Sequence, residues 1–226
     1  MKKRIVLSVT LAFLVALSSA YAQATDFFAL VRTGTPQAVQ DAIKQGADLN
    51  ARDADGLTPL MRAAVNNPNP AVITVLLKAG ADIKARDEQF GLTPLLWAAS
   101  GTDNPEVVTT LLKAGADIKA RATVNGFTAL MYAADGNPNP AVITVLLKAG
   151  SDIDAKSNAK TFGMTPLTLA AQENQHPDKV IITLLKAGAN AKATSTEGKT
   201  AFDYAKDNEY LEEGSDAYSA LEEASQ

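Results

Sequence analysis

The residues that could carry out chemistry are few in this chain and form no recognisable catalytic set. Its one histidine, His176, lies close in sequence to Glu173 and Asp178, and these three side chains would make an oxygen-rich metal site at most. The chain has no cysteine, which excludes disulfides, a thiolate metal site and a thiol nucleophile. No serine lies in the Gly-x-Ser-x-Gly turn that presents a hydrolase nucleophile. We therefore predict a protein that is not an enzyme, with no catalytic residue, metal or cofactor, and we interpret His176 as an exposed turn residue.

Four aspartates recur at one position of the sequence, two residues after a glycine. They are Asp48, Asp82, Asp117 and Asp152. Their spacing does not match a calcium-binding loop, which gathers its carboxylates within one short segment. A carboxylate in this place can accept hydrogen bonds from the amides of the loop that follows. We therefore interpret the four aspartates as structural.

These aspartates belong to an internal repeat. The segment NPNPAVITVLLKAG occupies residues 67–80 and occurs again, letter for letter, at 137–150. The glycines that end this segment in its strong and weak forms are Gly46, Gly80, Gly115, Gly150 and Gly188, at intervals of 34, 35, 35 and 38. A fixed period of this size indicates a solenoid or a propeller, in which each unit buries its apolar face against its neighbours.

One unit predicts a first helix with a clear start. Thr58 is a suitable N-cap, and Pro59 is a suitable first helical residue because it has no amide to leave unsatisfied. Ala63 and Ala64 then allow a neighbouring helix to approach closely. We expect this first helix to be the tightly packed one.

The same unit predicts a second helix and a loop. The Asn-Pro-Asn-Pro segment at 67–70 ends the first helix and starts the second. The second helix carries an apolar stripe made of Val72, Ile73, Leu76 and Leu77. Gly80 ends it with a left-handed residue, and the residues that follow should form a projecting, hairpin-like loop.

The repeated motifs resemble those of the ankyrin repeat family. The openings read TPLM at Thr58, TPLL at Thr93, TALM at Thr128, TPLT at Thr165 and TAF at Thr200, and the exits read GADLNA, GADIKA twice, GSDIDA and GANAKA. The family pattern is G-x-TPLH-x-AA, a VV-xx-LL second helix and a G-A-D-x-N-A exit. The resemblance runs from about Thr25 to the C-terminus and implies an all-α solenoid of helix-turn-helix units with projecting loops, about six units including two caps. We assign residues 23–56 to an N-terminal cap repeat, 57–198 to four internal repeats and 199–226 to a C-terminal cap, within one repeat domain over 23–226.

This chain departs from the family at the histidine of TPLH. The position holds Met61, Leu96, Met131 and Thr168 instead. We expect the hydrogen bonds of the family histidine to be replaced by apolar contact.

The first residues predict a secretory signal peptide over residues 1–22. Three basic residues at 2–4 precede an apolar run at 5–17, and Ala20-Tyr21-Ala22 provides a cleavage site between Ala22 and Gln23. The run is short for a membrane span, which disfavours an uncleaved anchor, and no cysteine follows it that could carry a lipid. The compact, lysine-rich leader is typical of bacteria. We therefore expect a periplasmic or secreted protein.

The charge of the chain argues against nucleic acid as a partner. Its net charge is −4, and without the leader 18 basic residues face 25 acidic ones, a net charge of −7. Affinity for a phosphate backbone depends on positive surface, and no basic cluster with interleaved aromatic residues is present. We predict a protein partner, no nucleic acid, no membrane span in the mature chain, and a monomer.

The resemblance implies a concave binding side formed by loop tips and first helices. The positions that map to it carry apolar, aromatic and arginine side chains, the types that dominate binding hot spots. Our candidates are Trp97, Tyr132, Phe127, Arg62, Met164, Phe90 and Phe162. The alternative, packing between repeats, is favoured at the equivalent positions Leu57, Leu92 and Leu169, whereas for Trp97 and Tyr132 both interpretations stay open.

A second row near the loops is basic. It consists of Arg52, Arg86, Arg121 and Lys156. The row could meet an acidic partner. Because Asp53, Asp87 and Glu88 lie beside it, a solvated ladder of charges is the favoured interpretation.

Three functions remain open. The first is a non-enzymatic scaffold, exported to the bacterial periplasm, that binds a partner protein through its concave face. The second is an inhibitor, immunity factor or escort of an exported enzyme such as a catalase. The third is a hydrolase within the array, which would require turnover that is lost when His176 is replaced.

Overall fold

The computed structural model describes residues 27–137, 139–172 and 174–226, and this part of the chain is helical with no strand. The predicted signal peptide lies outside it. Residues 27–33 are helical. The helices that follow are α2 (Pro36–Lys44), α3 (Pro59–Asn66), α4 (Pro70–Lys78), α5 (Pro94–Gly101), α6 (Pro105–Lys113), α7 (Ala129–Gly136), α8 (Ala141–Lys148), the short 3₁₀ helix η1 (Ala159–Thr161), α9 (Pro166–Gln172), α10 (Pro177–Lys186), α11 (Ala201–Ala205) and α12 (Asp216–Ser225).

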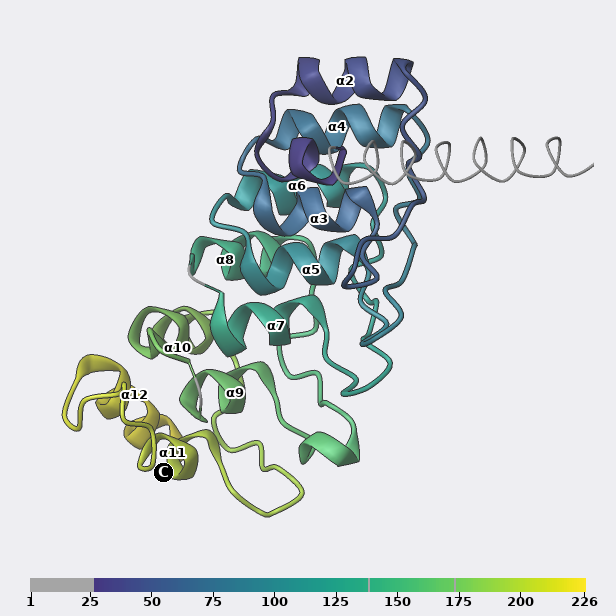
Figure 1. The fold of residues 1–226 in the computed structure, drawn as a ribbon. Helices are drawn as coiled ribbons and strands as arrows, with labels where there is room; N and C mark the ends of the chain where they lie inside the picture. Colours follow the sequence, from purple (N-terminus) through teal and green to yellow (C-terminus); the bar gives the residue numbers. More distant parts are fainter. Residues whose placement is uncertain (1–26, 138, 173) are drawn as a thin grey trace, which may run out of the picture.

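The helices form antiparallel pairs stacked in two layers (Figure 1). The first helices, α3, α5, α7, α9 and α11, pack in series, and the second helices, α2, α4, α6, α8, α10 and α12, form the other layer. From α2 to α10 the first helices pack more closely on one another than the second helices do, whereas α12 packs closely on α10. Two layers of unequal spacing curve toward the tighter layer, so the first helices line the concave side. The predicted all-α ankyrin solenoid is confirmed, as is the tighter packing of the first helices.

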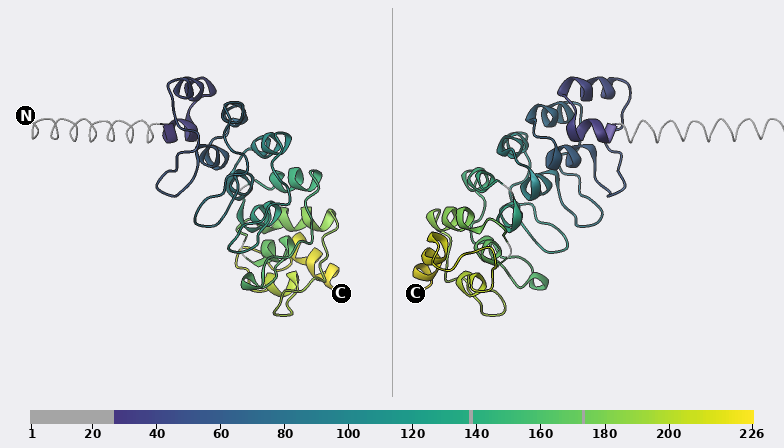
Figure 2. Two further views of the ribbon diagram at one scale, coloured as in Figure 1. Left: turned by 90° about the vertical axis from the view of Figure 1, so that its right-hand side faces the viewer. Right: turned by 60° about the vertical axis from the view of Figure 1, so that its left-hand side comes forward.

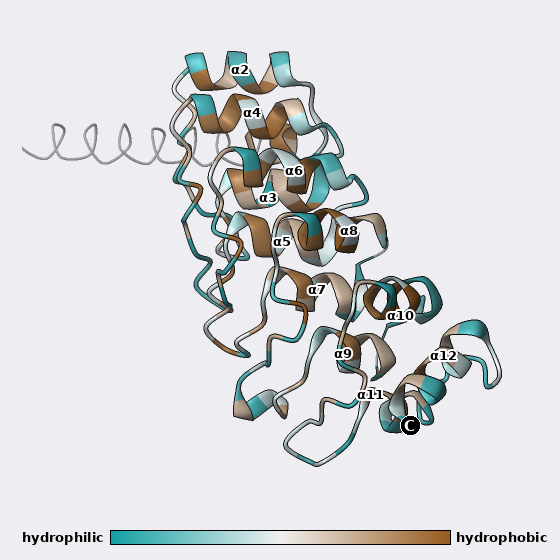
Figure 3. Cartoon of the chain, turned by 180° about the vertical axis from the view of Figure 1, so that it is seen from behind, coloured by the Kyte–Doolittle hydropathy of each residue, from teal (hydrophilic) through white to brown (hydrophobic). Residues whose placement is uncertain are grey.

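The small and branched apolar residues of each unit make the core. Ala63, Ala64, Val72, Ile73 and Leu76 have no exposed surface. Leu77, the outer edge of the predicted stripe, is partly buried. The helices carry both apolar and polar residues along their length (Figure 3). Each unit therefore buries its apolar face between its own helices and those of its neighbours.

Each first helix from α3 to α11 begins at a threonine whose hydroxyl accepts the amide hydrogen of the residue three positions on. These threonines are Thr58, Thr93, Thr128, Thr165 and Thr200, with distances from 3.2 to 3.4 Å. A cap of this kind satisfies one of the amides that a helix start leaves without a partner. The predicted starts are confirmed.

The expectation that apolar contact replaces the family histidine is wrong at three of the four positions. The sulfur atoms of Met61 and Met131 each accept the backbone amide of the capping threonine at 3.4 Å. The hydroxyl of Thr168 accepts the amide of Thr165 at 2.6 Å. Sulfur is a weak acceptor, yet it lies where the helix start needs one. Among these four, Leu96 alone offers only apolar contact.

A row of buried polar residues joins the turns between paired helices. We call it the turn row: Asn67, Thr102, Asn137, Asn174 and Asn208. Each of its asparagines donates a side-chain hydrogen bond of 2.8 to 3.0 Å to a carbonyl of the preceding first helix, at Val31, Ala99, Ala134 and Ala171. Thr102 has no side-chain nitrogen and makes no such bond within the described residues. The turn row links neighbouring repeats along one edge of the array.

The loops project together from the opposite edge (Figure 2). One backbone hydrogen bond closes each of them, as from the Asp87 amide to the Leu92 carbonyl at 3.0 Å. The recurring aspartates accept loop amides as predicted, with distances from 2.8 to 3.2 Å at Asp48, Asp82, Asp117 and Asp152. Gly80 ends α4 with a φ of 100°. The hairpin-like loops and the structural role of these aspartates are thus confirmed.

Candidate protein-binding site

The concave side carries three partly buried side chains at equivalent places on consecutive first helices. Arg62 lies on α3, Trp97 on α5 and Tyr132 on α7. In each case the polar end of the side chain is bonded to the loop that precedes its helix. These three residues form what we call the concave row, and their bonds fix its geometry.

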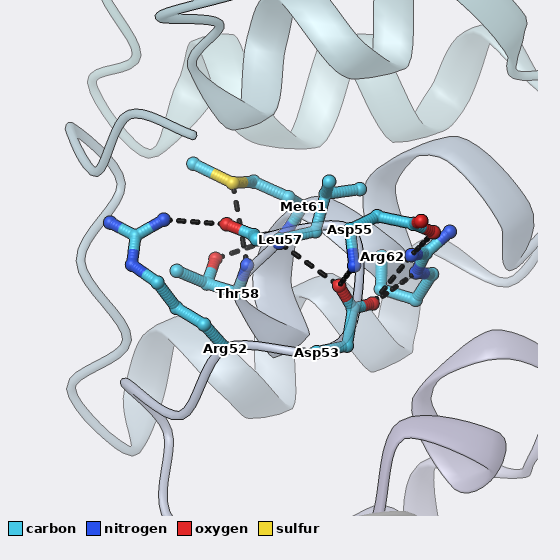
Figure 4. A network of polar contacts seen from close by, with 8 residues as sticks. Arg52, Asp53, Asp55, Leu57, Thr58, Met61 and Arg62 are labelled. Carbon is cyan, nitrogen blue, oxygen red and sulfur yellow. Dashed lines mark hydrogen bonds and ion pairs between the residues drawn. The ribbon is translucent and has the colours of Figure 1, made fainter. Parts of the chain in front are cut away.

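Arg62 is held by two carboxylates. Its Nε donates to Asp53 at 2.7 Å and its Nη2 donates to Asp55 at 2.6 Å, while a second Asp53 oxygen accepts the amides of Asp55 and Leu57 (Figure 4). Burial lowers the pKa of Arg62, but the hydrogen bonds that it donates to Asp55 and Asp53 more than compensate and raise the pKa above its usual value. The guanidinium is therefore paired within the chain, and its outer face is what a partner could reach.

Trp97 is held by a buried carboxylate. Its indole Nε1 donates to Asp87 at 3.1 Å. Asp87 is 4% exposed and also accepts the amides of Gln89, Phe90 and Leu92 at 2.6 to 2.9 Å. A buried carboxylate needs such donors to offset its lost hydration. Asp87 thus shapes the loop and orients the Trp97 ring at the same time.

Tyr132 is held by an amide. Its hydroxyl accepts a hydrogen bond from Nδ2 of Asn125 at 3.1 Å, and its ring lies against Phe127 with centroids 5.3 Å apart. Burial raises the pKa of Tyr132 above its usual value. The tyrosine is therefore neutral at physiological pH.

The other four candidates fall into two classes. Phe127 is 7% exposed and Met164 is 2% exposed, so both pack inside the array. The same holds for Leu57, Leu92 and Leu169, as the packing alternative expected. Phe90 and Phe162 are 39% and 49% exposed at the loop tips. The structure thus brings Arg62, Trp97 and Tyr132 together on the concave side and leaves Phe90 and Phe162 on a separate surface; their binding roles stay predictions.

The residues of the basic row are exposed, as the favoured interpretation expected, and their side chains are also bonded to backbone carbonyls. Arg52 donates to the Arg86 carbonyl at 2.8 Å, Arg86 to the Arg121 carbonyl at 2.9 Å, and Arg121 to the Lys156 carbonyl at 2.8 Å. Lys156 continues the series to the Thr194 carbonyl at 2.9 Å. Each arginine also donates to the carbonyl of its own loop glycine, at Gly56, Gly91 and Gly126. These side chains thus also tie neighbouring loops together, which the sequence analysis did not predict, because a guanidinium can donate in two directions at once.

No catalytic or metal site emerges from the described residues. His176 is exposed, as predicted, and Glu173 lies outside the described part. No group of three or more histidine, aspartate or glutamate side chains there could hold a metal ion. His176 lines an open hollow of about 380 Å³ together with Pro140 and Tyr210. Among the described helices, none has the length and apolar character to cross a bilayer.

The anchors of the concave row escaped the sequence analysis. Asp53 lies five residues before its opening threonine, Asp87 six and Asn125 three. Asp53 and Asp87 each follow a residue of the basic row directly, whereas Ala122 holds that place in the next loop and Asn125 makes the bond instead. The available signal was the aspartate after Arg52 and Arg86, but aspartate is too common in loops to be informative.

Comparisons with known proteins bear on the fold and on the kind of site. The family model described as ankyrin repeats (3 copies) matches residues 27–122, 88–157 and 130–213. This chain is similar to one chain of a solved complex, that of the predatory endopeptidase Bd0816 from Bdellovibrio bacteriovorus with immunity protein Bd3460. The TM-score is 0.68 and the identity 29%, over 87% of this chain and 96% of that one. The ankyrin repeat domain of Bcl-3, of the IkappaB protein family, has a TM-score of 0.66 and 24% identity over 87% of this chain and 81% of its own, which shows the fold alone. A mitochondrial disaggregase of Bos taurus is 46% identical over 57 residues, and this chain spans only 8% of that protein.

Proposed function

Because the chain belongs to the ankyrin repeat family, whose domains are typically non-catalytic protein-binding scaffolds, we propose that it binds its partner protein through the concave row. The observation that carries the proposal is that the rings of Trp97 and Tyr132 are held in place while part of their surface stays exposed. Both rings are partly buried, both lie on adjacent first helices, and both polar ends are bonded to loops. Fixed aromatic rings lose little conformational freedom on binding and contribute much contact area.

We further propose that the protein acts outside the cytoplasm. Support comes from the sequence of residues 1–22, with its basic start, apolar run and small-residue cleavage site. A fusion of these residues to a reporter that is active only after export would test this. Retention of the reporter in the cytoplasm of a bacterial host would contradict it.

A second candidate function is inhibition of, or immunity to, an exported enzyme. It is favoured by the similarity, over 87% of this chain, to a chain of the complex between an endopeptidase and an immunity protein. In this proposal the concave row covers the partner's active site. The partner's activity would then fall when the complex forms, whereas capture by a simple scaffold would leave it unchanged.

The decisive experiment is affinity capture from a periplasmic extract with the native protein and a Trp97→Ala, Tyr132→Ala variant. The matched control is Lys113→Ala, Lys148→Ala, which changes exposed residues at the ends of α6 and α8 in the second layer. We expect one protein to be retained by the native bait and the control and lost from the variant, with affinity reduced by about 2 to 4 kcal/mol. Equal retention by all three baits would exclude the concave row, and circular dichroism would show that the variant is folded.

A further inference from the structure

Apolar side chains are exposed in a row at the loop tips. Of the large hydrophobic side chains exposed in the described residues, Phe90, Val124 and Phe162 are 39%, 51% and 49% exposed and belong to three consecutive loops. We call these three residues the loop-tip row. Single exposed apolar residues are ordinary on protein surfaces, but neighbouring ones mark an interaction surface.

Hydrogen bonds between the loops hold the row together. The amide and the hydroxyl of Thr123 both donate to the Phe90 carbonyl at 3.0 Å. Asn158 donates from its amide to Asn125 at 3.0 Å and from its side chain to the Val124 carbonyl at 2.8 Å. The three loops follow one another along the same edge of the array (Figure 2). The three loops are therefore fixed relative to one another, and so is the order of their exposed side chains.

Phe162 is held in a backbone conformation that phenylalanine rarely adopts. Its φ is 58° and its ψ is 19°, and among the described residues it is the one non-glycine residue with a positive φ. A bulky residue in the left-handed region is strained, and such strain concentrates at functional positions. Because half of the ring surface is exposed, packing inside the array does not explain why phenylalanine occupies this position.

The charges around the row change sign from one end to the other. Glu88 lies two residues before Phe90; its side chain is 77% exposed, and its Oε1 lies 3.6 Å from Nε of Arg52 in an exposed ion pair. Lys160 lies two residues before Phe162, and it is exposed. The middle loop, residues 122–127, has no charged residue. The surface therefore runs from an exposed acid, paired at its inner side with Arg52, through three apolar side chains to a base.

Two copies of such a surface are complementary when they meet in antiparallel orientation, because the acidic end of each then faces the basic end of the other. We propose that the loop-tip row binds the same row of a second copy of this chain, in an antiparallel arrangement about a two-fold axis. Val124 then faces Val124 of the second copy, Phe90 faces its Phe162, and Glu88 faces its Lys160. A two-fold interface uses one patch on both subunits, so each contact occurs twice. The proposal departs from the monomer expected from the sequence, and it leaves the concave row free.

Sedimentation velocity and equilibrium of the purified chain over a range of concentrations would test this. The row is small, so we expect a weak, concentration-dependent dimer. Glu88→Lys and Lys160→Glu should each weaken it about tenfold or more, because each places like charges opposite one another twice. The double variant Glu88→Lys, Lys160→Glu should restore dimerisation to about the native level. This rescue is specific to the antiparallel pairing.

Three further variants complete the test. Val124→Glu should abolish the dimer. Phe162→Asn should abolish it while keeping or raising the melting temperature, since asparagine tolerates the left-handed region. Lys119→Glu is the matched control: it reverses an exposed charge at a repeat position where Asp154 occurs naturally, and it should leave the dimer intact. A monomer at all concentrations up to about 0.5 mM, a dimer that survives Val124→Glu, or a double variant without rescue would each overturn the proposal.

Discussion

At the residue scale, nearly every polar atom that the fold buries has a partner. Asp87 receives four hydrogen bonds, and the sulfur of Met61 takes the place of a side-chain oxygen or nitrogen at a helix start. Among the described residues, the buried side-chain oxygen or nitrogen without a partner is Oγ of Ser151. The equivalent position after the helix-ending glycine holds alanine in the other repeats, at Ala47, Ala81, Ala116 and Ala189. Ser151 is thus a position where the chain loses stability locally.

Ser151→Ala should therefore stabilise the protein. Removing a buried hydroxyl without a partner avoids its desolvation cost, and we expect a gain of about 1 kcal/mol in the free energy of unfolding, measured in urea. Ser157→Ala is the matched control, because the Ser157 hydroxyl accepts the Met164 amide at 2.8 Å and donates to the Thr161 carbonyl at 2.9 Å. It should destabilise the protein by about the same amount. A loss of stability in both variants would contradict this assignment.

At the element scale, neighbouring repeats are joined along both edges. The basic row ties the loops, and the turn row ties the turns between paired helices. In a solenoid, stability is close to the sum of the units and their nearest-neighbour interfaces. A side chain that bonds across an interface therefore acts on two repeats at once.

Arg86→Met should lower the free energy of unfolding by about 1 to 3 kcal/mol, because it removes hydrogen bonds from a charged donor to the Gly91 and Arg121 carbonyls. Arg86→Lys should lose less, since Lys156 shows that lysine at this position still reaches the next loop. Urea denaturation provides the measurement. Lys84→Met, an exposed neighbour whose side chain has no bond in the described residues, is the control. If all three variants had the same free energy of unfolding, the basic row would have no structural role.

Thr102 is the member of the turn row that does not bond to the preceding first helix in the described structure. Among the described residues its hydroxyl is bonded to Asn104 alone, at 3.3 and 3.4 Å, and not to the carbonyl of Ala64, which corresponds to Ala99 in the next repeat. Thr102→Asn should supply this bond and raise the free energy of unfolding by about 1 kcal/mol. The reciprocal change, Asn137→Thr, should lower it by a similar amount. If Thr102→Asn instead lowered stability, the site would lack room for the longer side chain.

At the scale of the whole molecule, the array ends in an acidic cap. Residues 207–226 contain seven acidic residues and no basic one. Asp203 caps the start of α11: its carboxylate accepts the Thr200 amide at 3.0 Å and the Thr200 hydroxyl at 2.8 Å. These bonds, with a smaller contribution from Lys206, lower the pKa of Asp203 from 3.8 to about 2. A group with a lowered pKa stabilises the fold above its unfolded pKa, and this contribution disappears as the pH falls toward the folded pKa.

The C-terminal cap should therefore lose stability between about pH 4 and pH 2. A carbon-detected NMR titration should place the midpoint of the Asp203 carboxyl group near the lowered value. Asp203→Ala should cost about 1 kcal/mol at pH 6 and less at pH 2.5, because the native carboxyl group is partly neutral there. Asp207→Ala, at an exposed residue with no side-chain bond in the described part, is the control. A titration midpoint at the ordinary value for aspartate would contradict the role of the cap.

The sequence predicted what depends on local signals. Some helix boundaries follow from the backbone preferences of the residues at them: helices start at Thr58-Pro59 and Asn69-Pro70, and one ends at Gly80. These boundaries could therefore be predicted from the sequence. The recurrence of Arg86 and its equivalents was also visible, but their acceptors are backbone carbonyls one repeat away, which no residue type signals. The sequence likewise could not separate the buried Phe127 from the partly exposed Tyr132, because burial depends on how far each loop bends over its helix.

The two identical segments, residues 67–80 and 137–150, give the molecule an internal standard. They form α4 and α8, which flank α6 on either side, and Val72, Ile73 and Leu76 are as completely buried as Val142, Ile143 and Leu146. Any difference in the amide exchange rates of the two segments must therefore come from their place in the stack and not from their composition. Within one sample, the chain can report how far the opening of either end spreads inward.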